Sequence, residues 1–211
     1  MRGCIMRVLY IDTSSSYLYA GIVENKKLLC SVKEKLGQEL SCLALPRIAD
    51  MFSKTSLVPN DINKIIVVDG PGSFTGIRVG LTIAKVYAWS LSIPITTITS
   101  LEAMATSVKC DEVKVPIIDA RRNYSYAAIY NHDNCLMEPQ HISNEVLTKK
   151  LDELSEYIII TNDETNLNGK KCNYDPDIES IVNKYVDKAE VNPHLVNPEY
   201  LKLTEAEESR M

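Results

Sequence analysis

The sequence lacks several patterns that would assign it to a familiar class. No segment approaches the roughly 20 consecutive apolar residues that a membrane helix needs. The six cysteines are scattered without a C-x-x-C pair, which is typical of small buried hydrophobes in a reducing cytosol. The three histidines (132, 141 and 194) include no pair four residues apart, which argues against a helix-borne zinc peptidase site. We therefore expect a cytoplasmic protein without a metal site.

Composition and charge are ordinary for a soluble protein overall but uneven along the chain. The 211 residues are 45% hydrophobic and 24% charged, enough for one sizeable core or two small lobes. Residues 1–109 carry a net charge of +4 and residues 110–211 one of −9, for a total of −5. Phosphate contacts supply much of the affinity for RNA, so an acidic chain without a basic stripe is a poor tRNA binder by itself.

A glycine turn between two apolar segments is the most informative local pattern. The apolar run 65–68 stops at Asp69, the turn Gly70-Pro71-Gly72 follows, and Ser73 is placed to cap a helix over 74–91. A strand, glycine turn and helix can present backbone N–H groups to a phosphate. The turn matches neither a Walker loop nor G-x-G-x-x-G, so a tight structural turn is an equally good interpretation.

The chain also repeats itself. Residues 11–22 align with residues 118–129 at an offset of 107, with six identical residues. In each copy an apolar strand ends at an aspartate, Asp12 or Asp119, and a polar turn leads to an alternating strand. Two related halves of this form predict a duplicated α/β fold of the actin, sugar kinase and Hsp70 class (ASKHA fold), with two lobes and paired phosphate turns facing a cleft.

Periodicity gives a coarse layout with an N-terminal lobe over 1–109 and a smaller C-terminal lobe over 110–211. The segment 109–114 is the predicted hinge, and the last ten residues are expected to be frayed. The predicted elements are strands 7–13, 17–24, 27–35, 64–69, 95–98, 115–120, 124–131 and 157–161, with helices 39–53, 74–91, 101–108 and 176–188.

Small residues form a stripe on the predicted helix 74–91. They recur every four residues, at Gly76, Gly80, Ala84 and Ala88. Glycine inside a helix costs about 0.8–1 kcal/mol relative to alanine, so this stripe needs a packing reason. Close packing onto the protein's own sheet and docking of a partner helix both satisfy that requirement.

The chain resembles the bacterial TsaB (YeaZ) family, non-catalytic relatives of TsaD needed for threonylcarbamoyladenosine on tRNA. The resemblance covers most of the chain and rests on motifs of quite specific sequence. These are Leu9-Tyr10-Ile11-Asp12-Thr13-Ser14, residues 70–78 with Ala84-Lys85, Ser100-Leu101-Glu102-Ala103, residues 118–122 and Pro198-Glu199-Tyr200-Leu201-Lys202. One departure is Leu40-Ser41, where many members carry His-Ser, which puts any role of that histidine in doubt.

The resemblance implies a non-catalytic partner that binds a TsaD-like subunit and keeps it active for threonylcarbamoyl transfer to adenosine 37 of tRNA. A TsaE-like ATPase is the expected third member, a homodimer is a further expectation, and tRNA would be reached only through the complex. No cofactor is required and no catalytic residue is predicted. The expected partner interface is shared by helices 39–53 and 74–91, with residues Leu43, Ile48, Gly76, Gly80, Ala84 and Ala88.

Two other functions are weighed against this one. The first is an ATP-binding or ATP-hydrolysing enzyme of the actin-like class, which needs carboxylates for Mg²⁺ and two open phosphate turns. Its vestigial cleft, with weak ATP or ADP binding, would use Asp12, Thr13, Ser14, Gly70, Gly72, Asp119, Arg121 and Arg122. The two arginines either clamp a phosphate or fill the second turn beside the aspartates, and we favour the second. A glycoprotease-like peptidase is the least favoured function.

Overall fold

The structure is a computed structural model that describes residues 5–202. The chain divides into two compact units. The first runs to Ser100 and includes Pro176–Pro198; the second runs from Leu101 to Asp175 and resumes at Glu199. This division differs from the predicted lobes 1–109 and 110–211, because the halves exchange one helix each. The helix at residues 100–107 follows the first sheet but packs on the second, and the helix at residues 178–185 follows the second sheet but packs on the first. In the described part of the chain, no helix is long and apolar enough to cross a membrane.

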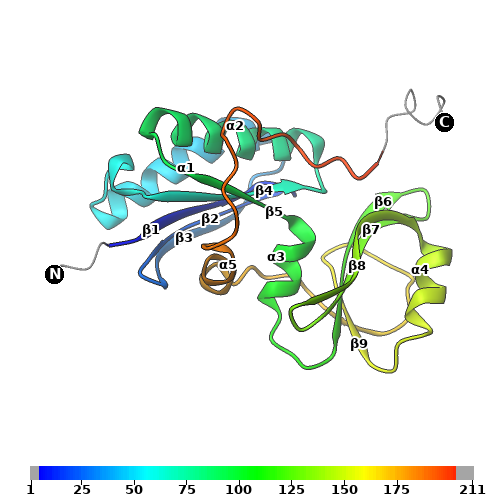
Figure 1. The fold of residues 1–211 in the computed structure, drawn as a ribbon. Helices are drawn as coiled ribbons and strands as arrows, with labels where there is room; N and C mark the ends of the chain where they lie inside the picture. The colour runs from blue at the N-terminus through cyan, green and yellow to red at the C-terminus, as the bar shows by residue number, and fades with distance from the viewer. Residues whose placement is uncertain (1–4, 203–211) are drawn as a thin grey trace. The chain divides into compact units, whose positions relative to one another are not determined.

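Unit 1 is built around a five-stranded sheet. Its strands are β1 (Arg7–Asp12), β2 (Tyr17–Glu24), β3 (Lys27–Lys35), β4 (Lys64–Gly70) and β5 (Ile95–Thr99), in the order β3-β2-β1-β4-β5. The first three strands are antiparallel neighbours, and β4 and β5 continue the sheet in parallel with β1. Helices α1 (Leu40–Thr55) and α2 (Phe74–Leu91) cover one face and α5 (Ile178–Tyr185) lies against the other (Figure 1). Two 3₁₀ turns, Gly37–Glu39 and Pro59–Asp61, complete the unit.

Unit 2 repeats this sheet with less cover. Its strands are β6 (Val113–Arg121), β7 (Tyr124–Asn131), β8 (Asn134–Ser143), β9 (Tyr157–Ile160) and β10 (Lys170–Cys172), in the order β10-β9-β6-β7-β8. Helix α4 (Asn144–Leu151) buries Leu147 and Leu151 against one face. Helix α3 (Ser100–Ser107) places Leu101 and Met104 against the other.

The two strand orders match element for element, with β1 to β5 corresponding to β6 to β10. In both sheets the central strand pairs antiparallel with the strand that follows it and parallel with the fourth strand. The predicted duplicated actin-like α/β fold is confirmed. The correspondence breaks at α2, because residues 161–169 join β9 to β10 without a helix.

Strand pairing corrects the predicted equivalence of Asp12 and Asp119 by one residue. Ile11 pairs with Ala20, and the corresponding Ala127 pairs with Ile117. Asp12 therefore matches Ile118 in the second half, and Asp119 matches Thr13. The turn between β6 and β7 contains one more residue than the sequence alignment assumes, with a register shift between Asp119 and Arg121. Because successive side chains of a strand point to opposite faces, the two aspartates lie on non-equivalent faces of equivalent strands.

Most predicted elements are confirmed to within a few residues, but β8, α4 and β10 were missed. Strand β8 is an edge strand that buries only Met137 and Ile142 and contains Pro139, so its sequence carries little alternation. Helix α4 and strand β10 are short, with eight and three residues. The predicted frayed tail lies outside the described residues, apart from Lys202.

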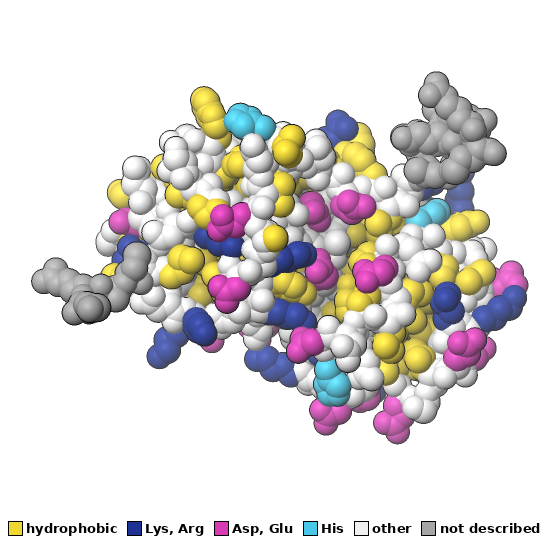
Figure 2. All heavy atoms as spheres, viewed as in Figure 1, with side chains coloured by type: hydrophobic (Ala, Val, Ile, Leu, Met, Phe, Trp, Pro, Cys, Tyr) yellow, Lys and Arg dark blue, Asp and Glu magenta, His cyan; other side chains and the backbone are white. Residues whose placement is uncertain are grey.

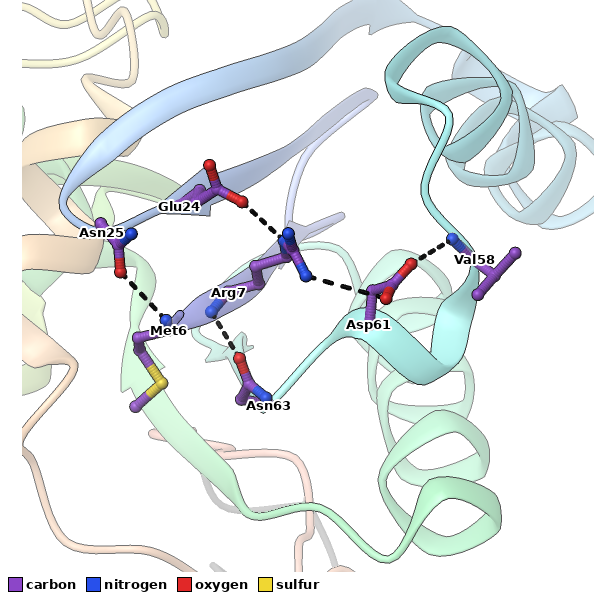
Figure 3. A network of polar contacts seen from close by, with 7 residues as sticks. All are labelled: Met6, Arg7, Glu24, Asn25, Val58, Asp61 and Asn63. Atoms are coloured by element: carbon purple, nitrogen blue, oxygen red, sulfur yellow. Dashed lines mark hydrogen bonds and ion pairs between the residues drawn. The ribbon is translucent and has the colours of Figure 1, made fainter. Parts of the chain in front are cut away.

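Polar contacts close the end of the first sheet where β1 begins (Figure 3). Arg7 Nε lies 2.7 Å from Glu24 Oε2, and its backbone N–H donates to Asn63 Oδ1 at 2.7 Å. Asp61 approaches Arg7 at 3.7 Å and also accepts a hydrogen bond from the Val58 N–H at 2.8 Å. The opposite end, where β1 and β4 finish, carries the motifs 9–14 and 70–78.

Candidate functional site

In unit 1, the turn after β1 and the glycine turn after β4 pack directly on each other. The Thr13 hydroxyl donates to the Gly76 carbonyl at 2.7 Å, and the Ser73 N–H donates to the Ser14 carbonyl at 2.7 Å. A Cβ atom on Gly72 would collide with the Ser14 carbonyl, and one on Gly76 with the Thr13 carbonyl. These glycines let two stretches of backbone approach each other, which favours the structural interpretation of the turn.

The rest of the small-residue stripe of α2 also faces the interior of unit 1. Gly80 contacts the Thr13 side chain, and Ala84 and Ala88 are 0% and 1% exposed within the core of unit 1. On α1, Ile48 is fully buried as well, and Leu43 is only partly exposed. The chain's own core thus covers the stripe, and the partner interface predicted for these residues stays a prediction.

The outward sides of the same two helices carry a different set of apolar residues. Leu45 of α1 is 48% exposed, and Phe74, Val86 and Trp89 of α2 are 56%, 57% and 65% exposed. The Arg78 guanidinium lies 3.8 Å from the centre of the Phe74 ring. We call Leu45, Phe74, Val86 and Trp89 the outer α1–α2 surface. The sequence signal was readable, since apolar residues occupy the side of α2 away from the glycines.

Asp12 is buried at the end of β1, with 1% exposure. Its Oδ1 accepts hydrogen bonds from the Ser14 N–H at 2.8 Å and from the Ser14 hydroxyl at 2.7 Å. Burial raises the pKa of Asp12 above its ordinary value, and the hydrogen bonds from Ser14 oppose this shift. Neutralisation of Asp12 by Arg121 or Arg122, and its placement opposite Asp119, stay predictions.

In unit 2, the turn after β6 is exposed. Arg121, Arg122 and Asn123 have φ angles of 66°, 53° and 63°, a left-handed conformation that is uncommon for residues other than glycine. Asp119 Oδ1 accepts from the Arg121 N–H at 3.0 Å, and the Asp119 N–H donates to Asp163 Oδ2 at 2.8 Å. The second turn is thus held by an aspartate of β6 and one that follows β9.

Asp119 also lines a cavity of about 350 Å³ that lies within unit 2. The cavity brings it together with acidic residues that sequence analysis did not select: Glu145, Asp163 and Glu164. Arg121 and Arg122 are not among its lining residues. The signal that could have found it is Asp163, which comes two polar residues after the apolar run 158–160.

Comparisons with known proteins agree with this architecture. A curated relative, the tRNA threonylcarbamoyladenosine biosynthesis protein TsaB of Bacillus subtilis (strain 168), is 30% identical over 96% of each chain. The chain belongs to the TsaB family. Escherichia coli (strain K12) TsaB is 31% identical over 61% of this chain and 56% of its own length. The family model for TsaD, described as tRNA N6-adenosine threonylcarbamoyltransferase, matches residues 34–166.

Solved structures support the fold of this TsaB family member. YeaZ from Pseudomonas aeruginosa superposes with a TM-score of 0.75 at 17% sequence identity, covering 93% of this chain and all of the other. A second structure, described as an uncharacterized protein from the same organism with similarity to peptidase YeaZ, gives a TM-score of 0.79 with the same coverage. At this level of identity the likeness concerns the fold alone.

Proposed function

We propose that this chain takes part in forming threonylcarbamoyladenosine on tRNA as the non-catalytic partner of a TsaD-like subunit. Membership of the TsaB family is the observation that carries the proposal, because curated members are named for this biosynthesis. The chain would bind the catalytic subunit and hold it in its active form for transfer to adenosine 37. A TsaE-like ATPase and a second copy of this chain are the other proposed partners.

The proposed contact is the outer α1–α2 surface. Its four large apolar residues lie on two helices that are in contact with each other on one face of the first sheet. Exposed aromatic and aliphatic side chains on the outer sides of adjacent helices are common at protein–protein interfaces. Trp89 is the most exposed of the four, and tryptophan is enriched among residues that dominate binding energy.

An ATP-hydrolysing enzyme is the second candidate, and the packing in unit 1 counts against it. The hydroxyl of Thr13 and the carbonyl of Ser14 are engaged with Gly76 and Ser73. A phosphate would have to displace the chain's own backbone from the first turn. The Asp12 carboxylate is moreover buried, and its Oδ1 already accepts hydrogen bonds from the Ser14 N–H and hydroxyl.

The test is reconstitution with the TsaD-like and TsaE-like proteins of the same host. We expect tRNA modification in the complete mixture and no ATP turnover by this chain alone. Robust ATP hydrolysis by the isolated protein, abolished by Asp12→Asn, would overturn the proposal.

Two variants locate the contact. Phe74→Glu and Trp89→Glu should abolish co-elution with the TsaD-like subunit and lower modification activity, while the melting temperature stays within about 2 °C because both side chains are exposed. Leu136→Glu is the matched control, since Leu136 is 55% exposed on β8 in unit 2. Equal binding by all three variants would move the interface away from α1 and α2.

A further inference from the structure

The turn between β6 and β7 presents two arginine side chains to solvent. Arg121 and Arg122 are both exposed, and no ion pair joins either of them to another residue between 5 and 202. The corresponding turn of the first half, residues 14–16, consists of serines. The two positive charges are therefore particular to the second half. A guanidinium group without a carboxylate partner is suited to binding phosphate oxygens, to which it donates paired hydrogen bonds.

The chain holds this turn in one shape. Its three residues, 121–123, all have left-handed φ angles. The Arg121 N–H donates to Asp119 Oδ1 at 3.0 Å. At the other end of the turn, the Asn123 carbonyl accepts from the Asn144 N–H at 2.8 Å. A turn that is already fixed loses little conformational entropy when its side chains bind a ligand, and such uncommon backbone conformations cluster at ligand sites.

Aromatic side chains follow the arginines. The Tyr124 ring stacks on the His141 ring, with their centres 4.7 Å apart and their planes at 12°. The Tyr126 ring lies 5.4 Å from the same His141 ring. His141 thus supports Tyr124, which is 41% exposed. An exposed ring held in this way is a platform on which a nucleic-acid base can stack. We call Arg121, Arg122, Tyr124 and His141 the Arg–Tyr ledge.

The second sheet separates the aromatic part of this ledge from the acidic cavity. Ser125 lines the cavity together with Asp119, with which it pairs across β6 and β7. Because side chains alternate along a strand, Tyr124 and Tyr126 point to the opposite face. Tyr126 accordingly packs in the cluster that contains Leu101 of α3. An anion that lies against the Tyr124 ring is therefore on the other face of the sheet from the carboxylates of the cavity.

We propose that the Arg–Tyr ledge contacts unpaired nucleotides of the tRNA on which the proposed function acts, and the inference rests on that function. One base stacks on Tyr124, and Arg121 and Arg122 bind the neighbouring phosphates. The unpaired nucleotides of RNA loops are those whose bases can leave their own stack for an aromatic ring. The ledge supplies only two cations on a chain of net charge −5, so it adds to the affinity of the complex and does not make the isolated chain a strong RNA binder.

The test is filter binding of an unmodified tRNA transcript to the complex of this chain with the TsaD-like subunit, at several salt concentrations. The double variant Arg121→Asn, Arg122→Asn should bind about tenfold more weakly. The slope of log affinity against log salt concentration should become shallower by about 1.4, the value for two phosphates of a single strand. Asparagine adopts left-handed φ angles more readily than arginine, so the turn should keep its shape.

Tyr124 is tested separately from the charges. Tyr124→Leu should weaken tRNA binding about tenfold and leave the salt slope unchanged, because it removes a stacking ring and no charge. Tyr124→Phe keeps the ring and should bind as the parent does. Lys150→Asn is the matched control for the arginines, since it removes a positive charge from an exposed position on α4, on the other face of the sheet, and should leave affinity unchanged.

Three results would overturn the inference. The first is parent-like tRNA affinity in both the double arginine variant and Tyr124→Leu. The second is equal weakening by Lys150→Asn, which would reduce the effect to general charge. The third is loss of co-elution with the TsaD-like subunit in the ledge variants, which would identify the ledge as a protein contact. Failure of the proposed function is distinguishable, because modification of tRNA by the parent complex tests that function and the tRNA affinity of the variants tests the ledge.

Discussion

The two halves of this chain share a strand order and differ in what covers the sheet. In unit 1, α2 seals the ends of β1 and β4, and its glycines contact the Thr13 backbone and side chain. In unit 2, a loop takes the place of α2 and leaves a polar cavity. The space-filling view shows both acidic and basic side chains across the surface, with apolar atoms exposed among them (Figure 2). One duplicated scaffold has thus been adapted by adding or removing a single helix.

The largest expected effect comes from breaking the seal in unit 1. Gly76→Ala places a methyl group against the Thr13 carbonyl, which belongs to backbone and cannot move aside easily. We expect a loss of about 3 kcal/mol or more in the free energy of unfolding, at the upper end of overpacking effects. Urea unfolding measures it. Thr82→Ala, on the exposed side of α2, is the control and should change stability by less than about 0.5 kcal/mol. Equal stability of the two variants would mean that α2 does not pack on the turn after β1.

The two halves differ at the start of their fourth strands, where the first half has a buried lysine. Lys64 is 3% exposed and donates to the Val186 and Lys188 carbonyls at 2.6 and 3.3 Å, whereas the corresponding residue of β9 is Ile158. Lys64→Ile should therefore destabilise the protein by about 2 kcal/mol, because it removes hydrogen bonds from a charged donor. Thermal unfolding measures it.

Lys149→Ala removes an exposed lysine with a single ion pair and should cost less than about 0.5 kcal/mol. If Lys64→Ile is as stable as the parent, Lys64 does not anchor the segment after α5.

Loss of charge should affect stability at Asp12 and leave it nearly unchanged at Asp119. Burial raises the pKa of Asp12, so the folded state favours the protonated form, and the resulting stability is lost as pH rises through the raised pKa. Asp12→Asn should then stabilise the protein at pH 7 by on the order of 1 kcal/mol. The gain should vanish below about pH 4, where the carboxyl is protonated in the unfolded chain as well. Melting temperatures across this range give the measurement.

Asp119→Asn alters an exposed group and should change stability by less than about 0.5 kcal/mol at either pH. A destabilised Asp12→Asn at pH 7 would show that the charged form of Asp12 is the one that the fold stabilises.

The smallest effect concerns the serines that cap one helix in each half. Ser73 accepts from the Gly76 N–H at 3.2 Å in α2, and Ser143 accepts from the Val146 N–H at 3.3 Å in α4. Replacing either serine by alanine should lower the free energy of unfolding by about 1 kcal/mol, because the backbone N–H three residues later loses its hydrogen-bond acceptor. Two separate unfolding transitions in either variant would show that the units do not unfold together.

Much of the architecture was predictable because strand pairing and helix periodicity leave strong local signals. The strands of the first half, the long helix with its Ser73 cap and the duplication were all confirmed. The second half was harder to predict, because β8 is an exposed edge strand and α4 buries only two residues. The sequence alone did not decide whether the small-residue stripe of α2 packs on the protein's own sheet or docks a partner helix. That decision required the contacts that the glycines make in the structure.

The sequence by itself determined the duplicated fold and the family, since both follow from local patterns of apolar residues, glycines and motifs. Only the tertiary structure decided which residues are equivalent and which are accessible. One extra residue in the turn after β6 moves Asp119 to the other face of its strand, because side chains alternate along a strand. The absence of a helix after β9 then leaves Asp119 and Asp163 at a cavity. Such consequences depend on which segments meet in space, and no local pattern in the sequence records them.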